Sequence, residues 1–252
     1  MDAWISRVCS LAEGAVRSRS SREHRRHVAR TKGARDIDYD GKRRQLLEKI
    51  TLHLMRREGA RASLRDLASA AGVSGPTLRH YFGDRQALIA AVLEECLRRG
   101  RPGLDAQRQS GLPLAASIHA YAADLVAAMT AEKSVRLGDM VALSLAEGFL
   151  DPAYSRPALD FILEPTLQGL EARLAEHAAR GELREGVDLR MAALMLVSPL
   201  MLACLHQQQL AGRHVRPLAL DDLIESACEA FLHAFGQGDA IDSRPRAELA
   251  RA

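Results

Sequence analysis

The chain has 252 residues, of which 47% are hydrophobic and only 4% aromatic. This length is enough to bury a full core in one or two domains, and the abundance of Ala, Leu, Glu and Arg predicts an all-α fold. The formal net charge of +3 hides an asymmetry, because residues 1–110 hold 23 Lys and Arg against 13 Asp and Glu, whereas residues 111–252 hold 12 against 19. A basic front half and an acidic back half favour a protein that meets a polyanion with one end only.

Several classes of protein are excluded by what the sequence lacks. We find no glycine-rich phosphate loop, no nucleophile motif and no His/Asp/Glu cluster with metal spacing, so no enzyme, metal site or cofactor is predicted. The N-terminus lacks the continuous apolar segment of a secretory signal, and a cytoplasmic protein is expected. The cysteines are too widely separated for a zinc site or a disulfide framework, and those in apolar helical contexts are expected to be buried, with a thiol redox sensor as the alternative. They are Cys9, Cys96, Cys204 and Cys228.

The first forty residues read as a basic arm. Residues 14–35 carry eight Lys and Arg against one acidic residue, with serines and almost no apolar periodicity. Residues 1–41 are therefore expected to be disordered, and such an arm can strengthen binding to a polyanion in a salt-dependent way. The alternative is that residues 1–27 are not translated and that Val28, through a GTG codon, is the initiator.

Residues 63–85 predict two short helices joined by a tight turn, and a longer amphipathic helix precedes them. Ser63 followed by Asp66 is a capping-box-like start. Gly72 can adopt the left-handed conformation that ends a helix, and Ser74 is a suitable N-cap for the next one. The segment is thus a helix-turn-helix candidate.

The second short helix has one apolar and one polar face. Leu78 and Phe82 point inward, whereas Pro76, Arg79 and His80 share the opposite face. A helix with such an outer face is suited to the DNA major groove. Taken alone, an ordinary helical hairpin with a solvated face explains the pattern equally well.

The flanking residues make the pattern specific. Residues 43–93 resemble the N-terminal domain of TetR/AcrR-family transcriptional regulators, which carry G-x-x-x-[ST]-[LV]-R-D-[IL]-A, then A-G-V-S-x-x-[TS]-L-x-x-Y-F, and a basic residue before an apolar helix. These appear here as Gly59–Ala68, Ala71–Phe82 and Arg85. The resemblance implies an all-α protein with an N-terminal three-helix helix-turn-helix head and a C-terminal helical domain for ligand binding and dimerisation. The expected divisions are the arm at 1–41, the head at 42–88, the effector-binding and dimerisation domain at 89–236, and a disordered tail at 237–252.

The resemblance also implies roles for single residues. Thr77 and Tyr81 match phosphate contacts, Arg79 and His80 match positions aimed at base edges, and Arg85 matches a basic residue, usually lysine, that grips the DNA backbone. Arg79 stands where the family often has an aromatic residue; an arginine there can read guanine, typically worth about 1–3 kcal/mol, or pair with a phosphate. The full expected DNA-binding set is Ser63, Ser74, Pro76, Thr77, Arg79, His80, Tyr81 and Arg85.

The rest of the chain predicts a succession of helices. Pro and Gly at 101–103 and at 111–113 are expected to interrupt them. Helices are predicted over about 114–130, 135–147, 153–180 with bends at Pro157 and Pro165 and an end at Gly181, 189–210, and 218–235.

The helix predicted at 189–210 is apolar nearly all round. A spanning helix needs about 20 predominantly apolar residues, and Gln207, Gln208 and Gln209 are expected to cut this one short, so no membrane is predicted. An all-round apolar helix in a soluble protein must be covered on every side. By resemblance, the last two helices form a four-helix interface in a homodimer, which places two recognition helices about one DNA turn apart on a two-fold symmetric operator.

The resemblance places a pocket for an unknown small-molecule effector among the helices between Leu114 and Leu205. Each candidate lining residue has plain core packing as its alternative, and the sparse aromatic and charged residues favour an apolar or amphipathic effector. The candidates are His119, Tyr121, Met129, Met140, Phe149, Phe161 and Met195. The function expected is a dimeric, sequence-specific DNA-binding transcriptional regulator, by family default a repressor that its effector releases from a palindromic operator. The alternative is a helical interaction or scaffold protein without specific DNA binding.

Overall fold

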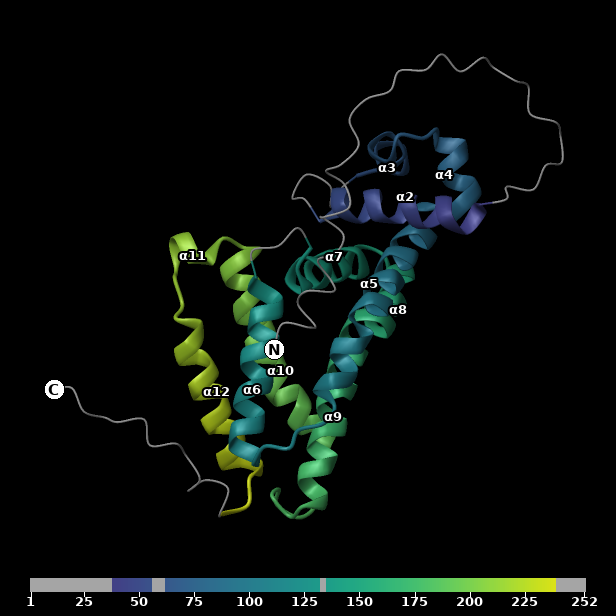
Figure 1. Cartoon of the computed structure of the whole chain (residues 1–252). Helices are drawn as coiled ribbons and strands as arrows, with labels where there is room; N and C mark the ends of the chain where they lie inside the picture. The colour runs from purple at the N-terminus through teal and green to yellow at the C-terminus, as the bar shows by residue number, and fades with distance from the viewer. Residues whose placement is uncertain (1–37, 56–61, 132–134, 239–252) are drawn as a thin grey trace, which may run out of the picture.

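The computed structural model describes residues 38–55, 62–131 and 135–238. The greater part of the predicted arm, with Cys9 and Val28, and the tail from residue 239 lie outside the described residues. Within those residues the regular elements are helices. One isolated antiparallel bridge pairs Leu183 with Gly236. Figure 1 shows a small head set on one end of a larger bundle of long helices.

The head consists of three helices, and local capping contacts fix the ends of the two short ones. They are α2 (Tyr39–Leu54), α3 (Leu64–Ala71) and α4 (Gly75–Phe82). The Ser63 hydroxyl accepts from the Asp66 amide at 3.3 Å and the Asp66 carboxylate accepts from the Ser63 amide at 2.9 Å, so the predicted capping box is present. Gly72 ends α3 with φ 74°, and Ser74 caps α4. Residues 39–41, assigned to the arm from sequence, belong to α2, because its first backbone hydrogen bond already runs from the Lys42 amide to the Asp38 carbonyl oxygen at 3.1 Å.

The second domain is a bundle joined to the head by one long helix. Its elements are α5 (Arg85–Gln107), α6 (Leu114–Thr130), α7 (Leu137–Leu150), η3 (Pro152–Tyr154), α8 (Ser155–Ala158), η4 (Leu159–Leu163), α9 (Glu164–Ala179), α10 (Leu189–Gln208), α11 (Gly212–Val215) and α12 (Leu220–Phe235). The predicted helix at 114–130 is confirmed at both ends. The short α11 was not predicted.

Proline shapes two of these elements differently from the prediction. The expected break at 101–103 is wrong, because α5 runs through Pro102, whose ring removes only one backbone donor, and the buried Gly100 and Gly103 lie in a helix packed on α9. The predicted helix at 153–180 is divided instead into η3, α8, the π-helical η4 and α9, with Pro165 in the first turn of α9.

Helix α10 is long and apolar enough to cross a membrane by length and composition alone. The expectation that glutamines cut it short is wrong, since the 20-residue helix includes Gln207 and Gln208. Its inner face packs against α6, α9 and α12. These contacts are those of a core helix within a bundle, and Gln207 itself is buried, donating to the Arg216 carbonyl oxygen at 3.0 Å.

The core is continuous between the two parts of the molecule. Leu67 and Leu78 of the head and Leu88 and Ile89 of α5 are fully buried in one cluster that extends into the second domain. The boundary predicted between residues 88 and 89 therefore falls inside a helix that both parts share. A change in the tilt of α5 would move the head with it.

Candidate nucleic-acid interface

Helix α4 presents a polar face to solvent and buries an apolar one. Leu78 and Phe82 are buried, whereas Thr77, Arg79 and His80 are exposed. Arg79 makes no ion pair with any residue that the structure describes. The predicted amphipathic pattern of the second short helix is thus confirmed, and its outer face exposes the Arg79 guanidinium, which forms no ion pair within the described residues.

An aromatic cluster connects this face to the first helix. The rings of Tyr39 and Tyr81 are stacked with centroids 4.8 Å apart, and His80 lies edge-on to both. The Tyr39 hydroxyl donates to the Tyr81 carbonyl oxygen at 3.4 Å. Sequence reasoning missed Tyr39 because it was placed in the arm. Its helical spacing to Arg43 and Leu46 would have assigned it to the first helix.

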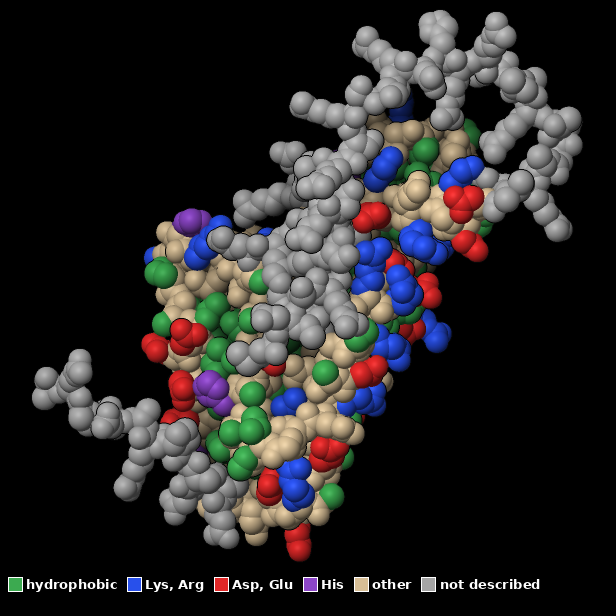
Figure 2. Space-filling view, viewed as in Figure 1, with side chains coloured by type: hydrophobic (Ala, Val, Ile, Leu, Met, Phe, Trp, Pro, Cys, Tyr) green, Lys and Arg blue, Asp and Glu red, His purple; other side chains and the backbone are tan. Residues whose placement is uncertain are grey.

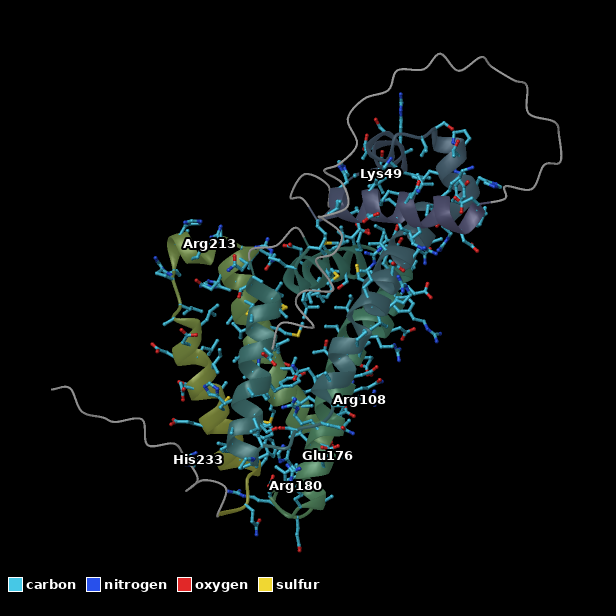
Figure 3. All side chains as sticks on the ribbon, viewed as in Figure 1. Lys49, Arg108, Glu176, Arg180, Arg213 and His233 are labelled. Atoms are coloured by element: carbon cyan, nitrogen blue, oxygen red, sulfur yellow. The ribbon has the colours of Figure 1, made fainter. Side chains whose placement is uncertain are left out.

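A groove of about 290 Å³ lies between α2 and the turn of the helix-turn-helix. Lys42, Lys49, Thr77 and Tyr81 are among its lining residues. The Lys49 ammonium, labelled in Figure 3, donates to the Ala71 carbonyl oxygen at 3.4 Å. Ammonium groups beside hydroxyl groups are the donors that phosphate oxygens prefer. Sequence reasoning missed both lysines, although their seven-residue spacing places them on one face of a helix.

The two predicted serines act as helix caps in this structure. The Ser63 hydroxyl donates to the Asp66 carboxylate at 2.7 Å, and hydrogen bonds from Ser63 hold the pKa of Asp66 below its ordinary value. The Ser74 and Thr77 hydroxyls are 2.8 Å apart. Both serines therefore set the start of a short helix, and Pro76 is exposed in the first turn of α4.

Arg85 does not lie as the resemblance implied. Its guanidinium forms a bidentate pair with Glu147 of α7, and its Nε donates to the Ala62 carbonyl oxygen at 2.9 Å. Hydrogen bonding to Glu147 raises the pKa of Arg85 above its ordinary value. In this arrangement the side chain is turned to the second domain, and its predicted contact with the DNA backbone stays a prediction. The partner lies 62 residues away in sequence and gives no local signal.

Basic side chains follow the head and the edge of α5 (Figure 2). The described head, residues 38–55 and 62–84, holds six Lys and Arg against five Asp and Glu. The basic excess of the front half therefore comes mainly from elsewhere, including the exposed Arg98 and Arg101 of α5.

The predicted effector residues are divided between interior and surface. Tyr121 borders a small cavity of about 30 Å³ between α5, α6 and α9, and its hydroxyl donates to the Thr166 carbonyl oxygen at 3.2 Å. Met129 and Met140 are buried, and Phe161 is half-buried. Plain core packing accounts for these methionines in the structure as it stands.

Three of the predicted effector residues lie on the surface and not in the interior. Phe149 is 82% exposed and Met195 is 56% exposed, so neither lines an interior cavity of this subunit. His119 lies on the surface, 3.1 Å from the Glu225 carboxylate. Sequence reasoning failed here because an almost uniformly apolar helix has no periodicity that distinguishes its inner from its outer face.

A larger cavity of about 530 Å³ lies at the junction of the head and the second domain. Leu54 at the end of α2 and Leu143 of α7 line it, together with Arg213 and His214 of α11. Figure 3 labels Arg213 at the end of the bundle that faces the head. Its volume falls in the range of small-molecule sites, whereas the cavity at Tyr121 is too small for an organic ligand.

Arg173 is a second buried feature that sequence reasoning missed. Its Nε donates to the Gln107 carbonyl oxygen at 2.7 Å, and Nη1 donates to both oxygens of Ser117 at 3.1 Å. Burial lowers the pKa of Arg173 from its ordinary value. The side chain ties α9 to α5 and α6 and stiffens the bundle opposite the head.

The thiols of the described cysteines are buried, which disfavours the reactive thiolate form. Burial raises the pKa of Cys96 and of Cys228 to about 12, and that of Cys204 to about 11. Because the thiolate is the reactive form, these values oppose a redox role for the three residues. In the described part of the chain no group of three or more His, Cys, Asp or Glu side chains is arranged to hold a metal ion.

The head and the bundle together define a helix-turn-helix DNA-binding protein with an all-α second domain. Residues 49–92 match the family model described as bacterial regulatory proteins, tetR family. The head is therefore a TetR-type DNA-binding domain. A comparison with curated proteins finds no significant match.

Solved structures share the fold over most of the chain. A TetR transcriptional regulator from Agrobacterium tumefaciens is 23% identical with a TM-score of 0.62, covering 79% of this chain and 96% of its own. SmeT, the repressor of the Stenotrophomonas maltophilia multidrug efflux pump SmeDEF, is 17% identical with a TM-score of 0.57, covering 81% and 94%. A putative regulator from Saccharomonospora viridis, solved with choline, is 16% identical with a TM-score of 0.62, covering 79% and 99%. At these identities the likeness concerns the fold.

Proposed function

We propose that this protein is a homodimeric repressor that binds a two-fold symmetric operator in cytoplasmic DNA and is released by a small-molecule effector. The observation that carries the proposal is the outer face of α4, where Arg79 and His80 are exposed and Arg79 has no ionic partner among the described residues. Side chains of this kind read base edges in the major groove. One of the similar structures, SmeT, is the repressor of a multidrug efflux pump.

The remaining DNA contacts are proposed to surround α4. Thr77 and Tyr81, with Lys42 and Lys49 across the groove, supply donors for one stretch of phosphates. Ser63, Ser74 and Pro76 lie at the starts of α3 and α4, where backbone amides favour a phosphate. Contacts to phosphates fix the register of the head, and those from α4 to bases supply the specificity.

Dimerisation is proposed through the outer faces of α10 and α12. Met191, Met195 and Leu202 of α10 are 52%, 56% and 66% exposed and follow one another at helical spacing. Ala230 and Ala234 give α12 a close-approach surface. An apolar stripe of this length on a soluble protein marks an interaction site, and a second copy covers it by two-fold symmetry.

The effector is proposed to bind at the junction cavity, which touches both the head and α7. Leu54 and Leu143 offer apolar contacts and Arg213 and His214 offer polar ones, so an amphipathic molecule fits. Two of the similar structures were solved with ligands, choline in one and triclosan in the other. The effector acts by binding one head position more tightly than the other, so that it shifts the population away from the DNA-binding state.

The test is a binding selection on random duplex DNA at near-physiological salt. The proposal predicts a two-fold symmetric site with its half-sites about one helical turn apart. Unselective, salt-sensitive binding would leave a helical interaction protein instead. For the effector, a thermal-shift screen compares the wild type with Ala146→Trp, which fills the junction cavity. A ligand that stabilises both proteins equally would contradict the proposed position.

A further inference from the structure

Arg85 connects the head to the second domain from the first position of α5. Its Nε donates to the carbonyl oxygen of Ala62, two residues before α3 begins, at 2.9 Å. Its two terminal nitrogens donate to the two carboxylate oxygens of Glu147 near the end of α7, each at 2.5 Å. One guanidinium therefore holds the start of α3 and the end of α7 together.

Neighbouring contacts fasten the same joint. The Tyr154 hydroxyl accepts from Nη1 of Arg85 at 3.4 Å, and the amide of Gln86 donates to the Ala153 carbonyl oxygen at 2.7 Å. Both acceptors belong to η3, which directly follows α7. Two successive residues at the start of α5 are thus bound to one segment of the second domain.

The pair is shielded from water, and this decides how it behaves when DNA binds. The side chains of Arg85 and Glu147 are only 24% and 11% exposed. Among the described residues, Glu147 is the one acidic side chain classed as buried. If Arg85 swung out to a phosphate, Glu147 would remain as a buried carboxylate without its cation, which is strongly unfavourable. The bidentate geometry also fixes both the distance and the relative orientation of the two helices.

We infer that Arg85 and Glu147 form an interdomain clamp that is kept in the DNA-bound state. Arg85 is then a positioning residue for α4 and not a contact to the DNA backbone. Because the head moves with α5, the angle that the clamp sets between α5 and α7 determines the distance between the two α4 helices of a dimer. This inference rests on the proposed DNA-binding dimer.

The experiment measures the affinity for the selected operator and for an unrelated duplex, over a range of salt, for five proteins. They are the wild type, Glu147→Gln, Arg85→Lys, the double variant, and the matched control Glu95→Gln. Glu95 pairs with Arg98 and Arg99 inside α5, and its side chain is 15% exposed, so the control removes a similarly shielded carboxylate without touching the clamp.

The clamp predicts that Glu147→Gln and Arg85→Lys each weaken operator binding about tenfold, a factor typical of coupling between sites. The double variant is expected to be no weaker than either single variant, because both remove the same interaction. Affinity for the unrelated duplex and the salt slope stay at wild-type values, and Glu95→Gln behaves as the wild type. Circular dichroism at the assay temperature confirms that each variant is folded.

A phosphate contact predicts the opposite pattern. Arg85→Lys would keep wild-type affinity, because an ammonium also binds phosphate, and Glu147→Gln would strengthen binding by releasing the arginine. Either result overturns the clamp. If every protein, the wild type included, binds the operator no more tightly than the unrelated duplex, the proposed function fails instead. This outcome differs from those that overturn only the clamp.

Discussion

The outer faces of α4 and α10 are both exposed, but their chemistry is opposite. The face of α4 carries Arg79 and His80, whereas that of α10 carries Met191, Met195 and Leu202. Polar donors form hydrogen bonds with water until a base edge takes the place of that water, so their exposure costs little free energy. An apolar stripe in contact with water is unfavourable until another surface covers it. One surface is therefore suited to a transient polar partner and the other to a permanent apolar one.

The two helices are also anchored differently. The eight residues of α4 depend on the Ser74 cap and on two buried side chains, Leu78 and Phe82. The twenty residues of α10 pack against α6, α9 and α12. The head is therefore the part that a single substitution can unfold without dismantling the rest of the molecule.

The largest effect is expected from Leu78→Ala, which should abolish the function of the α4 surface without affecting the α10 surface. Leu78 is fully buried, and removal of a buried leucine side chain typically costs about 2–5 kcal/mol. We expect loss of operator binding and of amide protection in residues 62–82, while the dimer persists. Hydrogen exchange and sedimentation measure the two properties. Loss of the dimer as well would show that the head and the bundle do not unfold separately.

The next effect is that of Leu202→Glu on the opposite surface. A carboxylate on the proposed two-fold interface is present twice and unpaired, so sedimentation is expected to show a monomer. Operator affinity should fall by about 100-fold or more, because binding through two linked heads is lost. Leu210→Glu, which alters an exposed leucine beyond the end of α10, is the control. A dimeric Leu202→Glu protein would place the interface elsewhere.

The smallest effect is expected from deletion of residues 1–27. These residues hold six Lys and Arg against three Asp and Glu. Binding to operator and to unrelated duplex is expected to weaken by the same factor, and the salt slope to fall by about 0.9 for each phosphate the arm neutralises. The dimer is unaffected. An unchanged salt slope would show that residues 1–27 neutralise no phosphate.

Local features of the fold could be predicted from the sequence, and they lie mainly in the head. Ser63, Gly72 and Ser74 were assigned correctly because caps and turns depend on residues within a few positions of one another. The buried pair Leu78 and Phe82 followed from helical spacing. The structural setting of the recognition helix was therefore predictable, whereas its individual DNA contacts stay predictions.

Features that depend on distant residues could not be predicted. The pairing of Arg85 with Glu147 joins two helices far apart in the chain, and no local pattern reports it. The outward position of Met195 could not be distinguished in a helix that is apolar on nearly every side. The junction cavity likewise arises where α2, α7, α10 and α11 meet, which only the packed structure defines.

The most direct test of DNA recognition by α4 compares Arg79→Ala with the wild type on the selected operator and on an unrelated duplex. Arg156→Ala, which alters an exposed arginine of α8, serves as the control. We expect Arg79→Ala to weaken operator binding by about 1–3 kcal/mol, to leave binding to the unrelated duplex nearly unchanged, and to preserve the proposed dimer. Wild-type affinity for the operator would contradict the assignment of the outer face of α4 to DNA recognition.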